Sequence, residues 1–144
     1  MVIGYRHTGI IVKNMEKSLY FYRDILGLEV VQNYSDGTDY INKITGITNA
    51  DVHMIKLKAK DGTIVEILEY RNHPTELMEQ QIYNAGACHI AFQVKDANQT
   101  YNILKDKGIT IISQPILSSE GIAKVFFCLD PNNVRIELVE MLDA

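Results

Sequence analysis

Apolar residues along the chain occur mostly in short runs rich in Ile, Val and Phe, a pattern typical of β-strands. Two segments are amphipathic at helical spacing instead, one after Asn14 and one after Asp96. The apolar face of the first consists of Met15, Leu19, Tyr22 and Leu26. Each half of the chain is therefore predicted to contain a strand, a helix and three further strands. The strands are expected near 5–13, 28–34, 51–59 and 63–70, and near 87–94, 109–113, 123–129 and 133–140.

Residues that begin and end helices flank both helical segments. Asp96, with Gln99 three positions later, has the pattern of a capping box, and Asn14 is a weaker cap for the first helix. Gly27 and Gly108 follow the two helices, where glycine adopts the left-handed conformation without steric cost. Turns are predicted at 60–62 and 130–133.

The two halves of the chain resemble each other, which indicates an internal repeat. Each half opens with a histidine, His7 or His89, followed two positions later by a small residue. Each half closes with a glutamate among branched apolar residues, Glu66 in TIVEILEY and Glu137 in VRIELVEM. The histidines are 82 positions apart and the glutamates 71. The first half therefore contains an eleven-residue surplus, which we place in the polar segment 36–50.

Two βαβββ units of this kind each leave one apolar sheet face uncovered. We therefore predict an α+β fold in which the units, about 5–71 and 87–141, form an open, barrel-like sheet around a shared cavity. The whole chain, residues 1–144, is expected to form this single domain. Residues 72–86 link the units, and Pro74 is expected to open a short helix there.

The composition, 47% apolar and 22% charged over 144 residues, is that of an ordinary globular chain. The net charge is −4 and no basic stripe is present, so we expect neither nucleic acid nor a membrane surface as a partner. No apolar run approaches the roughly 18 residues that span a bilayer, and we expect no signal peptide. We expect a cytoplasmic protein in which Cys88 and Cys128 are buried free thiols.

Four residues occupy equivalent places in the two units: His7 and His89 in the first strands, Glu66 and Glu137 in the last. A buried carboxylate is costly unless it is paired, protonated or bound to a metal. Two imidazoles and two carboxylates form a mixed ligand set that suits Zn, Ni, Co, Mn or Fe(II). We therefore predict one divalent metal ion in the cavity, with open positions for water or a bidentate substrate.

Each of these residues, taken alone, has a more ordinary interpretation. A single histidine in a strand is more often structural than a ligand. A single glutamate there more often faces solvent, as we expect for Glu69 and Glu140. The recurrence of both residue types at matching positions of a repeat favours the metal site. We expect His53 and His73 to be ordinary polar residues, with His53 a minor candidate for the cavity.

Three segments carry a resemblance to a known family: HTGIIVKNMEKSLYFYRDILGL from His7, ACHIAFQVKD from Ala87 and FCLDPNNVRIELVE from Phe127. With them the chain resembles the vicinal oxygen chelate superfamily. This superfamily contains glyoxalase I, methylmalonyl-CoA epimerase, extradiol dioxygenases, and fosfomycin and bleomycin resistance proteins. The resemblance covers nearly the whole chain and implies paired βαβββ modules around one divalent ion. The family's ligand positions fall on His7, Glu66, His89 and Glu137.

This resemblance implies a metal-dependent lyase or isomerase, and the His/Glu/His/Glu set is most similar to that of glyoxalase I, a lactoylglutathione lyase. The epimerases commonly have Gln where Glu66 stands, and extradiol dioxygenases use two histidines and one glutamate. An Fe(II) extradiol-type dioxygenase and a non-catalytic small-molecule binding or resistance protein remain as alternatives. We find no counterpart of the Arg and Asn that anchor glutathione in glyoxalase I, nor of the epimerases' second acid/base glutamate.

The implied reaction moves a proton on the carbon alpha to a carbonyl, through an enediolate that the metal stabilises by chelating two neighbouring substrate oxygens. Glu137 is the first candidate for the base that moves this proton, and Glu66 is the second. His7 and His89 would remain as metal anchors. We expect the segment 36–50 to contact the substrate, which is a small molecule. The resemblance also implies a homodimer.

Overall fold

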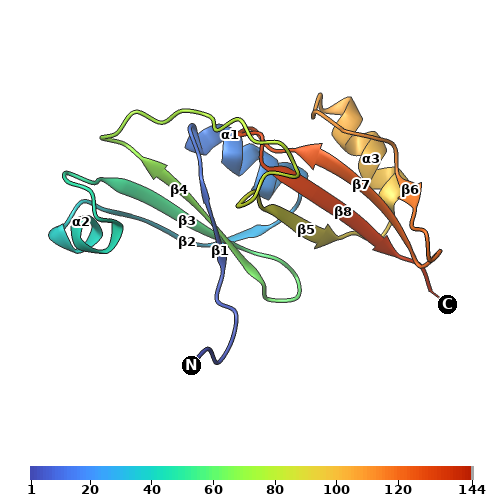
Figure 1. Ribbon diagram of the computed structural model, residues 1–144, viewed down its shortest axis with the longest axis horizontal. Helices are drawn as coiled ribbons and strands as arrows, with labels where there is room; N and C mark the ends of the chain where they lie inside the picture. The colour runs from blue at the N-terminus through green and yellow to red at the C-terminus, as the bar shows by residue number, and fades with distance from the viewer. Residues whose placement is uncertain (144) are drawn as a thin grey trace. The chain divides into compact units, whose positions relative to one another are not determined.

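The computed structural model describes residues 1–143 and divides the chain into two compact units. One comprises Met1–Leu77 and the other begins at Met78. Each unit contains one four-stranded sheet with helix packed beside it (Figure 1). No helix among the described residues is long and apolar enough to cross a bilayer.

The first unit consists of β1 (Thr8–Ile11), α1 (Met15–Leu19), the π-helical segment η1 (Tyr20–Ile25), β2 (Glu29–Asp36), α2 (Asp39–Thr45), β3 (Val52–Lys58) and β4 (Ile64–Tyr70). Its sheet has the strand order β1-β4-β3-β2. Strand β1 runs parallel to β4, and the other neighbouring pairs are antiparallel. The crossover from β1 passes through α1 and η1, as a parallel connection requires.

The second unit consists of β5 (His89–Gln93), α3 (Ala97–Asp106), β6 (Ile116–Leu117), β7 (Ala123–Leu129) and β8 (Arg135–Met141). Its strand order is β5-β8-β7-β6, again with the first and last strands parallel. This repeats the topology of the first unit strand for strand, so the predicted α+β class and paired βαβββ modules are confirmed. Within residues 1–143 both sheets remain open, and neither closes into a barrel.

Helix covers one face of each sheet and leaves the opposite face free to carry polar residues. In the second unit α3 contacts β7 and β8, and the ring of Tyr101 meets that of Phe126 edge-on at 5.8 Å. Ile136 and Leu138 are fully buried, whereas Glu137 between them points to the other face. In the first unit Ile67 alternates in the same way with Glu66. The candidate glutamates therefore lie on the sheet faces opposite those that the α1 and α3 helices cover.

The predicted helix caps are present. The Asn14 Oδ1 accepts a hydrogen bond from the Lys17 N–H at 3.0 Å, and the Asp96 Oδ1 accepts one from the Gln99 N–H at 2.8 Å. Gly27 and Gly108 have φ values of +80° and +74° in the left-handed region, which permits the chain to leave each helix sharply. These caps fix the points at which each helix begins and ends.

Two glutamates expected to face solvent instead hold the helices. The Glu69 Oε2 accepts a hydrogen bond from the Met15 N–H at 2.6 Å, and the Glu140 Oε2 accepts one from the Ala97 N–H at 2.8 Å. Met15 and Ala97 are the first residues of α1 and α3. Their N–H groups have no partner within the helix, and a negative charge there also complements the helix dipole. In each module, therefore, a glutamate at the equivalent position of the last strand is hydrogen-bonded to the first residue of the helix.

We expect Glu69→Ala and Glu140→Ala each to lower the free energy of unfolding by about 1–2 kcal/mol, because each leaves a helix N–H without its charged acceptor. Glu69→Gln and Glu140→Gln keep an acceptor oxygen and should lose less. Urea unfolding followed by circular dichroism measures the difference, with the exposed Glu120→Gln as the control. Alanine variants as stable as this control would show that the contacts contribute nothing to stability.

The first helix departs from its prediction after one turn. The Leu26 N–H donates to the Phe21 carbonyl five residues back at 2.9 Å, which is π-helical rather than α-helical spacing. The wider turn buries Phe21 and Tyr22 side by side, with their rings edge-on at 4.9 Å. Leu26, predicted on the apolar face, is only half-buried. Leu26 therefore does not take the place on the apolar face that a regular helix would give it.

Two predictions for the less regular segments are wrong. Residues 109–113 form only an isolated bridge from Ile111 to Cys128, and the short strand β6 begins after Pro115. Proline lacks the N–H that a continuous strand needs, which explains the interruption. Residues 72–86 contain no helix. Leu77, Met78 and Tyr83 there are exposed, so no packed apolar face stabilises a helix.

The eleven-residue surplus of the first half lies between β2 and β3 and contains the short helix α2. Its buried residue, Ile41, packs against Val52 and Met54 of β3, with Tyr34 and Leu68 nearby. Val52 and Met54 alternate with Ile55 and lie on the same face as Lys56. The insertion therefore covers one end of the sheet face that carries Glu66.

Candidate functional site

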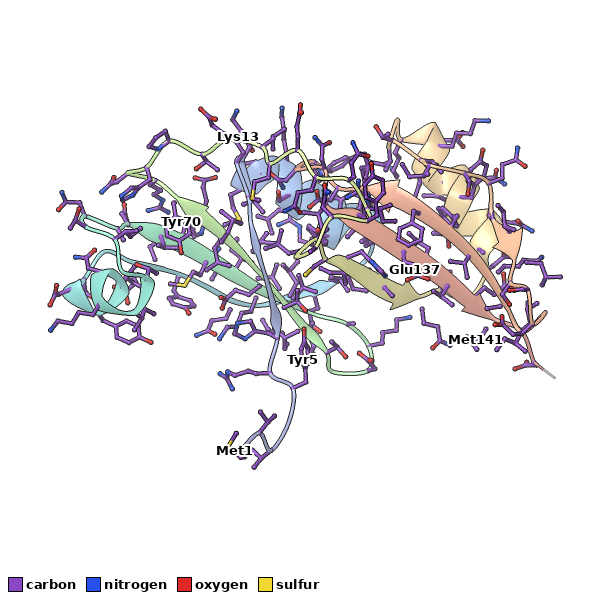
Figure 2. The ribbon with its side chains drawn as sticks, in the orientation of Figure 1. Met1, Tyr5, Lys13, Tyr70, Glu137 and Met141 are labelled. Carbon is purple, nitrogen blue, oxygen red and sulfur yellow. The ribbon has the colours of Figure 1, made fainter. Side chains whose placement is uncertain are left out.

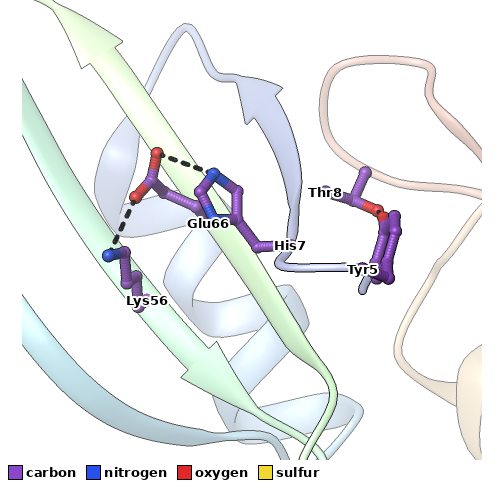
Figure 3. A network of polar contacts seen from close by, with 5 residues as sticks. All are labelled: Tyr5, His7, Thr8, Lys56 and Glu66. Atoms are coloured by element: carbon purple, nitrogen blue, oxygen red, sulfur yellow. Dashed lines mark hydrogen bonds and ion pairs between the residues drawn. The ribbon is translucent and has the colours of Figure 1, made fainter. Parts of the chain in front are cut away.

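The first histidine–glutamate pair lies on one face of the first sheet. His7 directly precedes β1, and Gly9 of β1 is paired with Glu66 of β4 in the parallel register. Because alternate residues share a face, this register places His7 beside Glu66. The His7 Nε2 lies 3.6 Å from the Glu66 Oε1 (Figure 3). Gly9 contributes no side chain at the position beside the carboxylate.

Glu66 is buried, with only 7% of its surface exposed. Each of its two oxygens faces one positively charged or ring-nitrogen partner. The Oε1 faces His7, and the Oε2 lies 3.7 Å from the Lys56 Nζ (Figure 3). Both distances exceed the 2.7–3.2 Å typical of a hydrogen bond. The carboxylate thus has a ring nitrogen on one side and an ammonium on the other, and neither neighbour holds it in a close hydrogen bond.

Lys56 was not singled out in the sequence. It stands directly opposite Glu66 in the antiparallel register of β3 and β4, and its side chain is 17% exposed. A lysine in the apolar run MIKLK is itself unusual, because lysine is rarely buried without a partner. That signal is present in the sequence, but its partner becomes known only with the strand register.

The second pair repeats the first in its own unit. His89 is the first residue of β5, and Ala91 is paired with Glu137 of β8, as Gly9 is with Glu66. The His89 Nε2 lies 3.1 Å from the Glu137 Oε2. The ring of Phe127 meets the His89 ring edge-on at 5.2 Å and orients it. Figure 2 labels Glu137 on its strand among the side chains of β8.

The two pairs differ in exposure. The side chains of His7 and Glu66 are 28% and 10% exposed, whereas those of His89 and Glu137 are 44% and 23% exposed. Next to the second pair, Arg135 is opposite His89 in the strand register and donates a hydrogen bond to the Gln80 carbonyl at 2.7 Å. Glu137 is therefore the more accessible of the two candidate carboxylates.

The donor atoms of each pair fit a divalent ion. Zinc ligands of this kind lie about 2.0–2.2 Å from the metal, so two on one ion can be no more than about 4.4 Å apart. Both pairs meet this limit through an imidazole Nε2 and a carboxylate oxygen. Within residues 1–143, no three His, Cys, Asp or Glu side chains are grouped as ligands, since each unit carries one pair.

Tyr34 of β2 adds a polar group near the first pair. It packs against the cluster of Ile41, Val52 and Met54 that α2 covers. Burial raises the pKa of the Tyr34 hydroxyl above its usual 10.0, and the negative charge of Glu66 raises it further. Tyr34 is therefore a neutral hydroxyl at physiological pH, on the same side of the sheet as Glu66.

A cleft of about 620 Å³ lies at the end of the first unit, lined by Gly37, Asn49, Ala50, Asp51 and Asn72. Three of these residues belong to the segment 36–50, which was expected to contact the substrate. The cleft contains none of the four predicted ligands. Two of its polar side chains are already engaged, because Asn72 donates to the Asn49 carbonyl at 3.0 Å and Asp51 pairs with Arg71 at 3.9 Å.

The remaining histidines and cysteines lie apart from the two pairs. His53 Nε2 is 2.7 Å from the Asn33 Oδ1, which fits its interpretation as an ordinary polar residue. The His73 Nδ1 is buried without a hydrogen-bond partner within the described residues. Cys128 is buried, and burial raises the pKa of its thiol to about 12. Cys88, expected in the core, is exposed because it precedes β5 and lies outside the alternating pattern.

The fold and the pairs together define a class: two βαβββ modules, each presenting a histidine at the start of its first strand or just before it, and a glutamate from its last strand. Residues 4–138 match the family model described as the glyoxalase/bleomycin resistance protein/dioxygenase superfamily. The chain belongs to this superfamily, which confirms the resemblance found in the sequence.

Known proteins similar to this chain span several activities. It is 28% identical over 136 residues to a probable lactoylglutathione lyase from Synechocystis, a match that covers 93% of this chain and 92% of that protein. A glyoxalase family protein from Bacillus cereus has the same fold, with a TM-score of 0.90 at 16% identity and coverage of 99% and 97%. The fosfomycin resistance protein FosX from Listeria monocytogenes, crystallised with Mn(II) and sulfate, has a TM-score of 0.65 at 20% identity and coverage of 99% and 95%. At these identities the two structures show the shared fold alone.

Proposed function

We propose that this chain is a divalent-metal-dependent lyase or isomerase of the glyoxalase type. Its substrate is a small molecule with two neighbouring oxygens, and the reaction moves a proton on the carbon alpha to a carbonyl. One observation carries the proposal: the same His Nε2 and Glu carboxylate pair recurs in both modules, at 3.6 Å and 3.1 Å. The probable lactoylglutathione lyase from Synechocystis among the chain's relatives supports the lyase assignment.

His7, Glu66, His89 and Glu137 would hold one ion between them, within one chain or across a homodimer. The ion, one of Zn, Ni, Co, Mn or Fe(II), would supply Lewis acidity to the two substrate oxygens. FosX supports the choice of a divalent ion, because that structure of the same fold was crystallised with Mn(II).

Glu137 takes up the proton in this proposal. Its carboxylate accepts the proton from the carbon alpha to the carbonyl. The C–H electron pair becomes a carbon–carbon double bond, and the carbonyl π pair moves onto the carbonyl oxygen to give an enediolate. The same carboxyl group then returns the proton to the former carbonyl carbon while the substrate hydroxyl proton passes to the neighbouring oxygen, so the product is an isomer of the substrate and no further reactant is needed. Glu137 suits this role better than Glu66 because its side chain is 23% exposed, against 10% for Glu66. Glu66 is also less suited to accept the proton because the ammonium of Lys56 faces it.

Proton exchange in D₂O tests the reaction class. Metal-free protein is loaded with one ion at a time. It is then incubated separately with S-lactoylglutathione, with another thioester and with an α-hydroxyketone. We expect deuterium to be incorporated at the carbon alpha to the carbonyl of at least one compound, only when the ion is present. Nuclear magnetic resonance measures this incorporation. Oxygen uptake with a catechol and Fe(II) would instead identify a dioxygenase. Tight binding without exchange or product would identify a binding protein.

A further inference from the structure

Lys56 is a charged residue in the middle of β3, directly opposite Glu66 in the strand register. Its side chain is mostly buried, with 17% exposed, and Glu66 is its only ion-pair partner within residues 1–143. The 3.7 Å between the Lys56 Nζ and the Glu66 Oε2 is longer than a charge-assisted hydrogen bond of about 2.7–2.9 Å. The ammonium is therefore held near the carboxylate while its donors remain available.

The second module has an uncharged residue at the position equivalent to Lys56. Lys56 is paired with Glu66 in the strand register, and Phe127 is paired with Glu137 at the equivalent place in the second module. Phe127 is half-buried and packs against His89. A large apolar residue can therefore pack beside a candidate ligand glutamate in this fold. The lysine of the first module adds a positive charge that packing alone does not require.

The charges of the metal-free and metal-bound site differ in whether Lys56 has a negatively charged partner. In the absence of metal, the ammonium of Lys56 balances the carboxylate of Glu66. Once a divalent ion is held by Glu66 and Glu137, the two carboxylates neutralise the ion, and the charge of Lys56 is left over. An unbalanced charge in a mostly buried place is costly, so an anion beside it is favoured.

We propose that Lys56 determines specificity by pairing with an anionic oxygen of the substrate, such as a carboxylate next to the chelated oxygens. This inference rests on the proposed metal-dependent function. It narrows the substrate class to molecules that carry a negative charge near their vicinal oxygens. It also makes the site bind a bare divalent ion more weakly than the four ligands alone would, because Lys56 repels the ion.

Calorimetric titration separates these effects, with Mn(II) as the first probe and oxalate, a dianion with vicinal oxygens, as the second. Lys56→Met should bind Mn(II) roughly tenfold more tightly, since a nearby like charge is removed. The Mn(II)-loaded variant should bind oxalate about tenfold or more weakly, since a hydrogen bond to a charged group is lost. Lys56→Arg should retain oxalate affinity. Lys58→Met, which removes an exposed lysine from the same strand, is the matched control.

The outcomes distinguish this inference from the proposed function. If Lys56→Met binds both Mn(II) and oxalate as the unmodified protein does, the role of Lys56 is overturned while the metal site stands. If the unmodified protein binds neither Mn(II) nor any of Zn(II), Ni(II), Co(II) and Fe(II), the proposed site fails and the inference fails with it. Thermal unfolding of Lys56→Met verifies that the variant folds, and Lys56→Gln replaces it if it does not.

Discussion

Glu137→Gln is expected to lower turnover by about 10²–10⁴-fold, the usual contribution of a positioned general base. Glutamine keeps the shape of the side chain and one oxygen that can bind a metal, but it cannot accept the proton. The fold should therefore remain intact, since Ile136 and Leu138 on either side of it supply the buried contacts of β8. The measurement is kcat on the substrate identified by deuterium exchange, with unfolding followed in parallel.

The exposed Glu120→Gln is the control for this prediction, since Glu120 lies in a turn outside both pairs. Glu66→Gln distinguishes the two candidate bases. If Glu66→Gln loses turnover and Glu137→Gln retains it, the roles assigned to the two carboxylates are reversed. Unchanged turnover in both variants would mean that neither carboxylate moves the proton.

His7→Ala and His89→Ala should each lower the affinity for a divalent ion by more than about 100-fold. Groups that only orient a ligand already cost 10–100-fold when removed, and a ligand should cost more. His7 and His89 lie in different units, so a loss in both variants that leaves no site of the original affinity would show that both modules serve one ion. The affinity is measured by competition with a metal indicator.

His53→Ala is the matched control, because His53 is paired with Asn33 rather than with a candidate ligand. Its affinity should equal that of the unmodified protein. Loss of affinity in only one of His7→Ala and His89→Ala would restrict the metal to one module. The paired-module account would then be wrong.

The strands and helix ends that follow from local patterns could be predicted from the sequence. Asn14, Asp96, Gly27 and Gly108 act through their own backbone neighbours, so their roles do not depend on distant residues. The repeat of histidine and glutamate could also be predicted, and in the structure each histidine lies beside the glutamate of its own module. Each pair is brought together because the first and last strands of a module are parallel neighbours.

Features that depend on contacts between distant segments could not be predicted in this way. Glu69 has the sequence surroundings of a solvent-facing glutamate, yet it accepts a hydrogen bond from Met15, 54 positions away. Lys56 gains its partner only through the register of β3 with β4. The π-helical segment Tyr20–Ile25 also replaces the regular helix that the spacing of the apolar residues predicts. Each of these features is set by packing that a local pattern does not contain.

The number of divalent ions per chain tests the central claim most directly. Elemental analysis of untagged protein, purified without chelator and then repeated after loading with excess Mn(II) and desalting, gives this number. The account predicts one ion per chain, because the pair in each module supplies half of one ligand set. No bound ion would contradict the metal site, and two ions per chain would show that the pairs bind metal separately.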